Sequence, residues 1–139
     1  MKIIKFGGKS LAQQQGLDQV ISIIQQKIQA GESLVTVVSA RGATTDLLDN
    51  LLEKASLNNN DDSTWQAFVQ EQLPQSFINL SKEYKLLEDI LSGVRLTGDY
   101  TEKTKDLVLA QGEILAAKQL AYSLQKLGID ARFVDSRHF

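Results

Sequence analysis

The segment LVTVVSA, residues 34–40, constrains the fold more than any other stretch, because it is apolar and β-branched almost without interruption. A strand with one solvent-exposed face alternates between apolar and polar side chains, whereas a strand inside a parallel sheet is covered on both faces and forms a continuous apolar run. We therefore predict that this segment is a strand of a parallel sheet and that both of its faces are covered.

Helical and extended patterns alternate along the rest of the chain. Two further β-prone runs predict strands at residues 2–6 and 131–135, and NNNDD at 58–62 predicts a loop. Apolar residues recur at three- and four-residue steps in the segments that we predict to be helical: 17–28, 47–55, a stretch around 65–69, 77 to about 93, and 112–127. This alternation predicts an α/β fold, with a mainly parallel sheet layered with helices.

Several residues predict where these helices begin and end. Gly31 and Gly128 follow the first and last helical segments, as expected of residues that stop a helix. Thr44 or Thr45 could act as the N-cap of the helix at 47–55. Pro74, the only proline, is expected to separate the third and fourth helices.

The number of strands is small for such a sheet. Three buried strands leave little to cover the run at 34–40 on both sides, and the last predicted strand is followed by only four residues. We therefore expect the chain, residues 1–139, to be the incomplete N-terminal part of a longer α/β domain.

Composition excludes several classes of function. A formal net charge of −2 and an isoelectric point near 5.4 give no reason to expect a nucleic-acid partner. We expect no membrane segment, because no apolar run approaches the roughly 18 residues that span a bilayer, and the N-terminus does not resemble a signal peptide. With no cysteine and one histidine, disulfides, thiol catalysis and a structural metal site are not expected, and a cytoplasmic location fits.

Gly8-Lys9-Ser10 resembles the end of a phosphate-binding P-loop, but the spacing excludes one. A P-loop has its first glycine five residues before the glycine of Gly-Lys-Ser, and that position is Ile3. A dinucleotide-binding fingerprint fails as well, because no third glycine follows Gly7 and Gly8 at the required distance.

A strand, a Gly-Gly turn and a helix remain as the description of residues 2–28. Gly7 and Gly8 would let the backbone approach a phosphate closely, and the N–H groups at the start of a helix bind anions. Lys5, at the end of the strand, would project into the same crevice. From these residues alone, a simple tight turn with a solvated Lys5 is about as well supported as a phosphate-binding turn.

A second turn of the same kind, SARGATT, follows the strand at 34–40. Its hydroxyl-bearing residues Ser39, Thr44 and Thr45 lie at the carboxyl end of that strand, which is the edge where ligands bind in open α/β sheets. Two such turns after two parallel strands would face one crevice. The alternative is that the threonines only cap a helix.

Three blocks together resemble the aspartate kinases, which have the amino-acid kinase fold. KFGGKSLA (5–12) is similar to K-F-G-G-[TS]-S-[VL]-[AG] of that family, and VVSARGATTDLL (37–48) resembles V-[VL]-S-A-x-x-x-x-T-[DN]-x-L. The segment at 109–139 resembles a third block, in which a G-E helix start precedes G-[IL]-x-A-x-x-x-D-[AS]-R. Residues 91–113 look most like aspartate kinases that are fused to homoserine dehydrogenase.

The resemblance implies ATP-dependent phosphorylation of the β-carboxylate of L-aspartate, the entry step to lysine, threonine and methionine. It implies that Lys5 reaches the transferring phosphate as the catalytic residue. It further implies that Gly7, Gly8, Ser10 and Ser39 lie along the nucleotide phosphates.

For the amino acid, the resemblance implies that Thr45 and Glu113 hold aspartate. Taken alone, Glu113 is more simply explained as a first-turn glutamate that complements a helix dipole. The implied cofactors are ATP and Mg²⁺, with the metal held mainly through the nucleotide phosphates rather than by protein ligands. No general base is needed, because the attacking carboxylate is ionised at neutral pH.

Two departures from the family pattern shape our expectations. Lys9 stands where the family has threonine or serine; it could strengthen phosphate binding, crowd the turn, or simply point into solvent. The family's kinase domain continues well past position 139 and is followed by regulatory ACT domains. We therefore expect no turnover by this chain alone, and association into homo-oligomers through an uncovered sheet edge.

Two other interpretations stay open at the level of the sequence. One is a different amino-acid kinase, of the acetylglutamate or glutamate 5-kinase type, which the second and third blocks fit less well. The other is a non-catalytic remnant that binds nucleotide weakly or serves as an interaction module.

Overall fold

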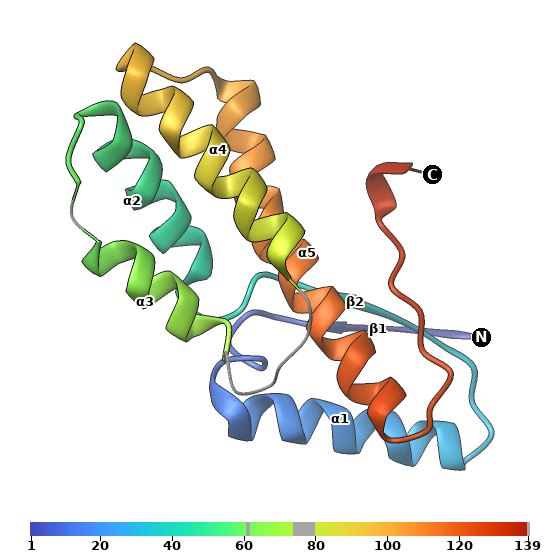
Figure 1. Cartoon of the computed structure of the whole chain (residues 1–139). Helices are drawn as coiled ribbons and strands as arrows, with labels where there is room; N and C mark the ends of the chain where they lie inside the picture. Colours follow the sequence, from blue (N-terminus) through green and yellow to red (C-terminus); the bar gives the residue numbers. More distant parts are fainter. Residues whose placement is uncertain (61, 74–79, 139) are drawn as a thin grey trace.

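Helices make up most of the structure and pack beside one small sheet (Figure 1). The computed structural model describes residues 1–60, 62–73 and 80–138. In chain order the elements are β1 (Lys2–Phe6), α1 (Gln13–Gln29), β2 (Leu34–Val38), α2 (Thr44–Ser56), α3 (Ser63–Glu71), α4 (Ser81–Thr97), α5 (Glu102–Lys126) and a short 3₁₀ turn at Ser136–His138. The predicted α/β class is confirmed.

The sheet consists of β1 and β2, which pair in parallel with a register running from Lys2 opposite Leu34 to Phe6 opposite Val38. Helix α1 forms the crossover between them, as parallel pairing requires. Both strands therefore end at the same edge of the sheet, and the turns that follow them start side by side.

Only one face of this sheet is covered by the described residues. Phe6, Ile4 and Val38 pack into a cluster with α1 and the second half of α5. On the opposite face, Ile3 is 75% exposed and Val37 is 45% exposed. The prediction that residues 34–40 are covered on both faces is therefore wrong for the described part of the chain, because α1 and α5 lie on the same side.

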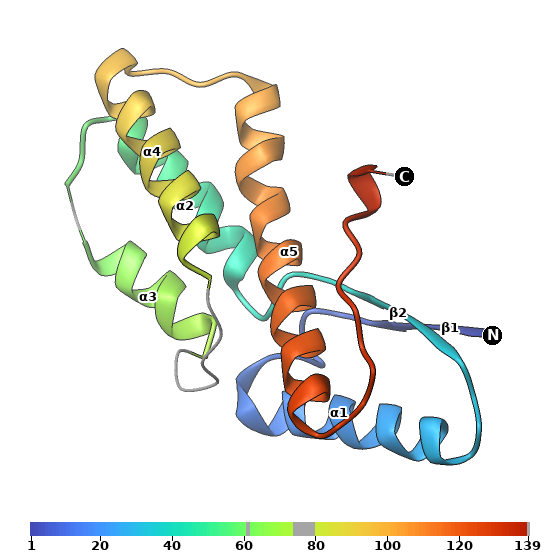
Figure 2. The same cartoon turned by 45° about the vertical axis from the view of Figure 1, so that its right-hand side comes forward.

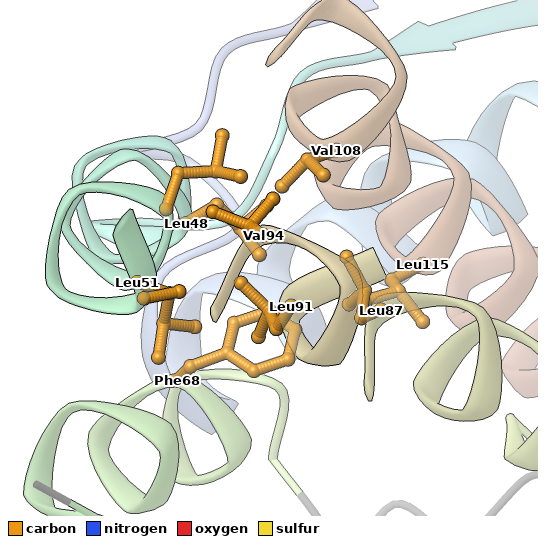
Figure 3. Packing of buried hydrophobic residues seen from close by; sticks show 10 residues of the cluster. Leu48, Leu51, Phe68, Leu87, Leu91, Val94, Val108 and Leu115 are labelled. Carbon is orange, nitrogen blue, oxygen red and sulfur yellow. The ribbon is translucent and has the colours of Figure 1, made fainter. Parts of the chain in front are cut away.

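A second cluster joins α2, α3, α4 and the first half of α5 (Figure 3). Phe68 of α3 is fully buried at its centre, and the rings of Trp65 and Tyr84 lie 5.4 and 6.0 Å from the Phe68 ring. The buried members of this cluster are Leu48, Leu51, Leu52, Ala55, Phe68, Leu87, Leu91, Val94, Val108 and Leu115.

Helix α5 is longer than the predicted segment 112–127. It begins at Glu102, where the Thr101 hydroxyl accepts a hydrogen bond from the backbone N–H of Thr104 (3.1 Å). The predicted start at residue 112 is wrong, because Gly112 lies inside the helix. Buried residues surround much of α5, since it packs against both clusters, and this weakens the one-sided pattern that a sequence reader looks for.

The other helices agree with their predicted positions, with one difference at the end of α4. α1 and α5 end just before Gly31 (φ 84°) and Gly128 (φ 80°), as predicted. Helix α4 continues to Thr97 instead of ending near residue 93. Pro74, which was expected to separate α3 from α4, and Phe77 lie outside the described residues.

No strand forms at residues 131–135, so this prediction is wrong. After α5 the chain turns back and runs beside the helix (Figure 2), where the ammonium of Lys118 lies 5.3 Å from the centre of the Phe133 ring. Side chains from 129 to 135 alternate between half-buried and exposed, as in a strand. A groove of about 480 Å³ is lined by this segment, β2 and α5, and the segment does not join the sheet of β1 and β2.

Candidate functional site

The turns after β1 and β2 touch each other directly. The backbone N–H of Ser39 donates to the carbonyl of Phe6 (3.2 Å), and that of Gly42 donates to the carbonyl of Gly8 (3.0 Å). We call residues 7–12 the first turn and residues 39–44 the second turn. The prediction that both turns lie at one edge of the sheet is confirmed, and the predicted crevice between them stays a prediction.

Gly8 makes this contact possible. A Cβ atom at position 8 would lie 2.3 Å from the carbonyl oxygen of Ala40, which belongs to the backbone and cannot turn away as a side chain could. By contrast, a Cβ at Gly7 would have no atom within 4 Å. The two glycines therefore differ in what they do: Gly8 allows the turns to approach, and Gly7 borders open space.

The first turn leaves three consecutive N–H groups without a backbone acceptor. The N–H groups of Ser10, Leu11 and Ala12 donate back to the carbonyls of residues 7, 8 and 9 (3.1–3.3 Å). Within the described part of the chain, the N–H groups of residues 7, 8 and 9 donate to no carbonyl outside the strand ladder. Successive free N–H groups in a turn form a concave surface that binds anions.

Two lysines flank these N–H groups. Lys5 is exposed and lies opposite Val37 on the uncovered face of the sheet, directly before the first turn. Lys9 lies within the turn and is exposed as well, as is Ser10. Both ammonium groups are therefore open to solvent beside the first turn.

The three hydroxyl residues in and directly after the second turn have different environments. Ser39 is half-buried, Thr44 is fully buried and Thr45 is exposed. The hydroxyl of Thr44 accepts a hydrogen bond from Nε2 of Gln72 (2.7 Å), which also donates to the carbonyl of Phe68 (3.1 Å). The prediction that Thr44 or Thr45 caps α2 is wrong: the N-cap is Ala43, without a side-chain hydrogen bond.

This difference predicts unequal effects for two adjacent threonines. Thr44→Val keeps the shape of the side chain but removes the acceptor of buried Gln72, so we expect a loss of about 1 kcal/mol in the free energy of unfolding. Thr45→Val is the matched control and should change it by less than about 0.5 kcal/mol. Urea denaturation followed by circular dichroism measures both, and equal effects would contradict the structure.

Helix α5 packs against the second turn at Gly112, the residue before Glu113. A Cβ at Gly112 would lie 2.9 Å from Cβ of Ala40 and 3.0 Å from Cγ2 of Thr44, so the helix can pass this closely only with glycine there. Glu113 is the next residue and is exposed, and it borders the groove beside β2. Gly112 thus lets α5 pack against the second turn, and Glu113 follows it in the same helix.

Sequence reasoning missed two charged residues here. Arg41 belongs to the second turn and is fully buried, and Glu71, the last residue of α3, accepts a hydrogen bond from the backbone N–H of Ala43 (3.3 Å). Burial lowers the pKa of Arg41 to about 10, and the negative charge of Glu71 opposes that shift. Nothing in the sequence indicates the burial, because arginine is normally exposed.

Two kinds of feature are not found in the part of the chain that the structure describes. No group of three histidine or acidic side chains there is arranged to hold a metal ion. No described helix combines the length and the apolar character needed to cross a membrane.

Comparison with known proteins places this site in context. The chain is 27% identical to the bifunctional aspartokinase/homoserine dehydrogenase 1 of Zea mays and 28% identical to aspartokinase 1 of Arabidopsis thaliana, both described as chloroplastic, over 96% of its length. It spans only 16% and 25% of those two proteins.

A solved structure shows the same fold. Aspartokinase III of E. coli, in complex with aspartate and ADP, matches 97% of this chain with a TM-score of 0.78 at 23% sequence identity, and the match covers 31% of that protein. The model of the amino acid kinase family matches residues 1–139. The chain, with its two abutting glycine and hydroxyl turns, therefore belongs to the amino acid kinase family.

Proposed function

We propose that this chain supplies the ATP-phosphate and amino-acid contacts of an aspartate kinase, which transfers the γ-phosphoryl group of ATP to the β-carboxylate of L-aspartate. The observation that carries the proposal is the first turn, where the N–H groups of residues 7, 8 and 9 donate to no acceptor among the described residues and the side chains of Lys5 and Lys9 lie close by in the sequence. The E. coli structure, which contains aspartate and ADP, and the aspartokinases among the relatives support the choice of substrate.

The chemistry asks for charge stabilisation and positioning more than for covalent help. Phosphoryl transfer spreads negative charge over the oxygens of the moving group, and fixed N–H groups and an ammonium stabilise that charge without reorganising. In our proposal the N–H groups of Gly7 and Gly8 contact the phosphates, and Ser10 and Ser39 add hydroxyls. Lys5 is the catalytic residue that contacts the transferring group.

On the amino-acid side, we assign Thr45 and Glu113 to aspartate. A hydroxyl suits a carboxylate, and the exposed Glu113 carboxylate suits the α-ammonium group. No hydrogen bond or ion pair to either side chain occurs within the ranges that the structure describes, so both are available to a ligand. The attacking carboxylate is already ionised at neutral pH and needs no general base.

The proposal predicts that Lys5 contributes more to nucleotide binding than Lys9. Lys5→Met removes a charge-assisted contact worth about 1.5–3 kcal/mol, so the dissociation constant for Mg·ADP should rise roughly 10- to 100-fold. Lys9→Met serves as the matched control, and we expect a rise of no more than about threefold, as for a solvated charge. Isothermal titration calorimetry on the 139-residue chain measures both.

A larger rise in the dissociation constant for Lys9→Met than for Lys5→Met would assign the phosphate contact to Lys9 and overturn the role of Lys5. No binding of Mg·ADP by a chain that circular dichroism shows to be folded would overturn the nucleotide site itself. Competition among L-aspartate, L-glutamate and N-acetyl-L-glutamate, each titrated in the presence of Mg·ADP, separates the aspartate kinase assignment from the other amino-acid kinases.

The finer parts of the assignment are proposals as well. We place the reaction at the start of lysine, threonine and methionine biosynthesis and the chain in the cytoplasm. Mg²⁺ would be held through the nucleotide phosphates and would neutralise part of their charge. We also propose self-association through the edge of the small sheet, since unpaired strand edges favour pairing with another chain.

A further inference from the structure

Arg41 is a buried charge that has no hydrogen-bond partner among the described residues. Its side chain is fully buried, and none of its three guanidinium nitrogens makes a hydrogen bond within the described part of the chain. Its lowered pKa of about 10 still leaves it protonated at neutral pH. An unpaired buried charge costs several kcal/mol, and for this reason buried arginines are almost always paired with an anion.

The carboxylate of Glu71, whose charge acts on Arg41, makes its hydrogen bond to another group. Glu71 is close enough to raise the pKa of Arg41, yet its Oε1 atom accepts from the N–H of Ala43 instead, at a long 3.3 Å. This N–H belongs to the N-cap of α2, which has no side-chain cap of its own. A helix N-terminus favours a negative group, so Glu71 occupies from α3 a position that would suit an anionic ligand.

The second turn is shaped to admit this carboxylate. Gly42 has a φ of 52°, and a Cβ there would lie 2.0 Å from Oε1 of Glu71. Any other residue would push the carboxylate out of the turn. The carboxylate is held by one long hydrogen bond, however, and Glu71 itself is only half-buried, so a competing anion can reach the position.

We propose that Arg41 and the N–H of Ala43 form a second anion site, distinct from the first turn, and that Glu71 fills this site from within until a small oxyanion displaces it. The chemistry shared by the possible ligands is a compact oxyanion, either a carboxylate of a free amino acid or a phosphate group. On displacement, the ligand gains the N–H of Ala43 and the charge of Arg41, and Glu71 moves toward solvent.

Neutralising Glu71 tests the competition. In a Lys5→Met background, which suppresses phosphate binding at the first turn, Glu71→Gln should tighten the binding of inorganic phosphate or of L-aspartate about tenfold, because a neutral amide competes less well at a helix N-terminus. Glu53→Gln is the matched control, because it changes the net charge by the same amount at an exposed position outside the second turn. It should leave the affinities for phosphate and for L-aspartate unchanged. Calorimetric titrations with each ligand separately show which source of oxyanion the site accepts.

The role of Arg41 has its own test. Adding Arg41→Met to Glu71→Gln should return the affinity to its starting value, whereas Arg41→Lys should retain part of the gain. If Arg41→Met does not fold, the Nε–Hε signal of Arg41 in ¹⁵N NMR spectra of the Glu71→Gln chain replaces it, and that signal should shift on ligand addition.

Two results would overturn the proposal. The first is that Glu71→Gln and Glu53→Gln bind each ligand with equal affinity. The second is that the tighter binding in Glu71→Gln persists when Arg41→Met is added, or that the Nε–Hε signal of Arg41 does not shift when ligand is added. Neither result depends on the nucleotide. Failure of Mg·ADP to bind the unaltered chain would overturn the proposed kinase function and leave this anion site standing.

Discussion

Gly8→Ala should disrupt the site and destabilise the fold together. The added Cβ would lie 2.3 Å from the carbonyl oxygen of Ala40, so the two turns must separate and the hydrogen bond from Gly42 to Gly8 is lost. We expect a loss of about 1–3 kcal/mol in the free energy of unfolding, as for overpacked cores. In the proposed function, binding of Mg·ADP falls as well, because the N–H groups of the first turn no longer converge.

Gly7→Ala is the matched control, one residue away. A Cβ at Gly7 meets no atom within 4 Å, so stability should change by less than about 0.5 kcal/mol. Urea denaturation and calorimetric titration of the two variants separate the effects. Equal stability of both variants would show that the turns are not in contact.

Phe68→Ala should have the largest effect on stability. Phe68 is fully buried and packs with side chains of α2 and α4 (Figure 3). The rings of Trp65 and Tyr84 lie next to its own ring. Truncating a buried phenylalanine costs about 3–5 kcal/mol, which is a large part of the total stability of a small domain. Urea denaturation measures the change, and Leu96→Ala, at a side chain that is 89% exposed, provides the control.

The consequence of this truncation extends to the site. Glu71 and Gln72 lie at the end of α3 and hold the second turn through Ala43 and Thr44. Loosening α3 should therefore also loosen the second turn. A variant that unfolds at the same urea concentration as the unaltered chain would contradict the described packing.

Much of the fold could be predicted because the signals are local. Helices α1 and α2 each bury one face, and this gives their apolar residues a regular spacing in the sequence. Strands β1 and β2 are marked by short β-branched runs. The failures arise where distant segments decide. Residues 131–135 have the composition of a strand but lie across a groove from β2, and α5 starts ten residues before Gly112 because it serves two clusters.

The same division applies to the candidate site. Gly8, Thr45 and Glu113 could be selected from motifs, since their residue types and spacing carry the resemblance to a family. The burial of Arg41 and the reach of Glu71 from α3 into the second turn could not, because both depend on how α3 packs. The hydrogen bond from Gln72 to Thr44 could not be predicted from the sequence for the same reason.

Helix α5 gives this arrangement a thermodynamic consequence. Its Val108 and Leu115 belong to one cluster, Leu120 and Leu124 belong to the other, and Gly112 touches the second turn between them. Opening of either half therefore disturbs the same helix that packs against the second turn. A ligand that binds only the folded chain thus protects both halves against local unfolding, so the small site acts as a cooperative link across the molecule.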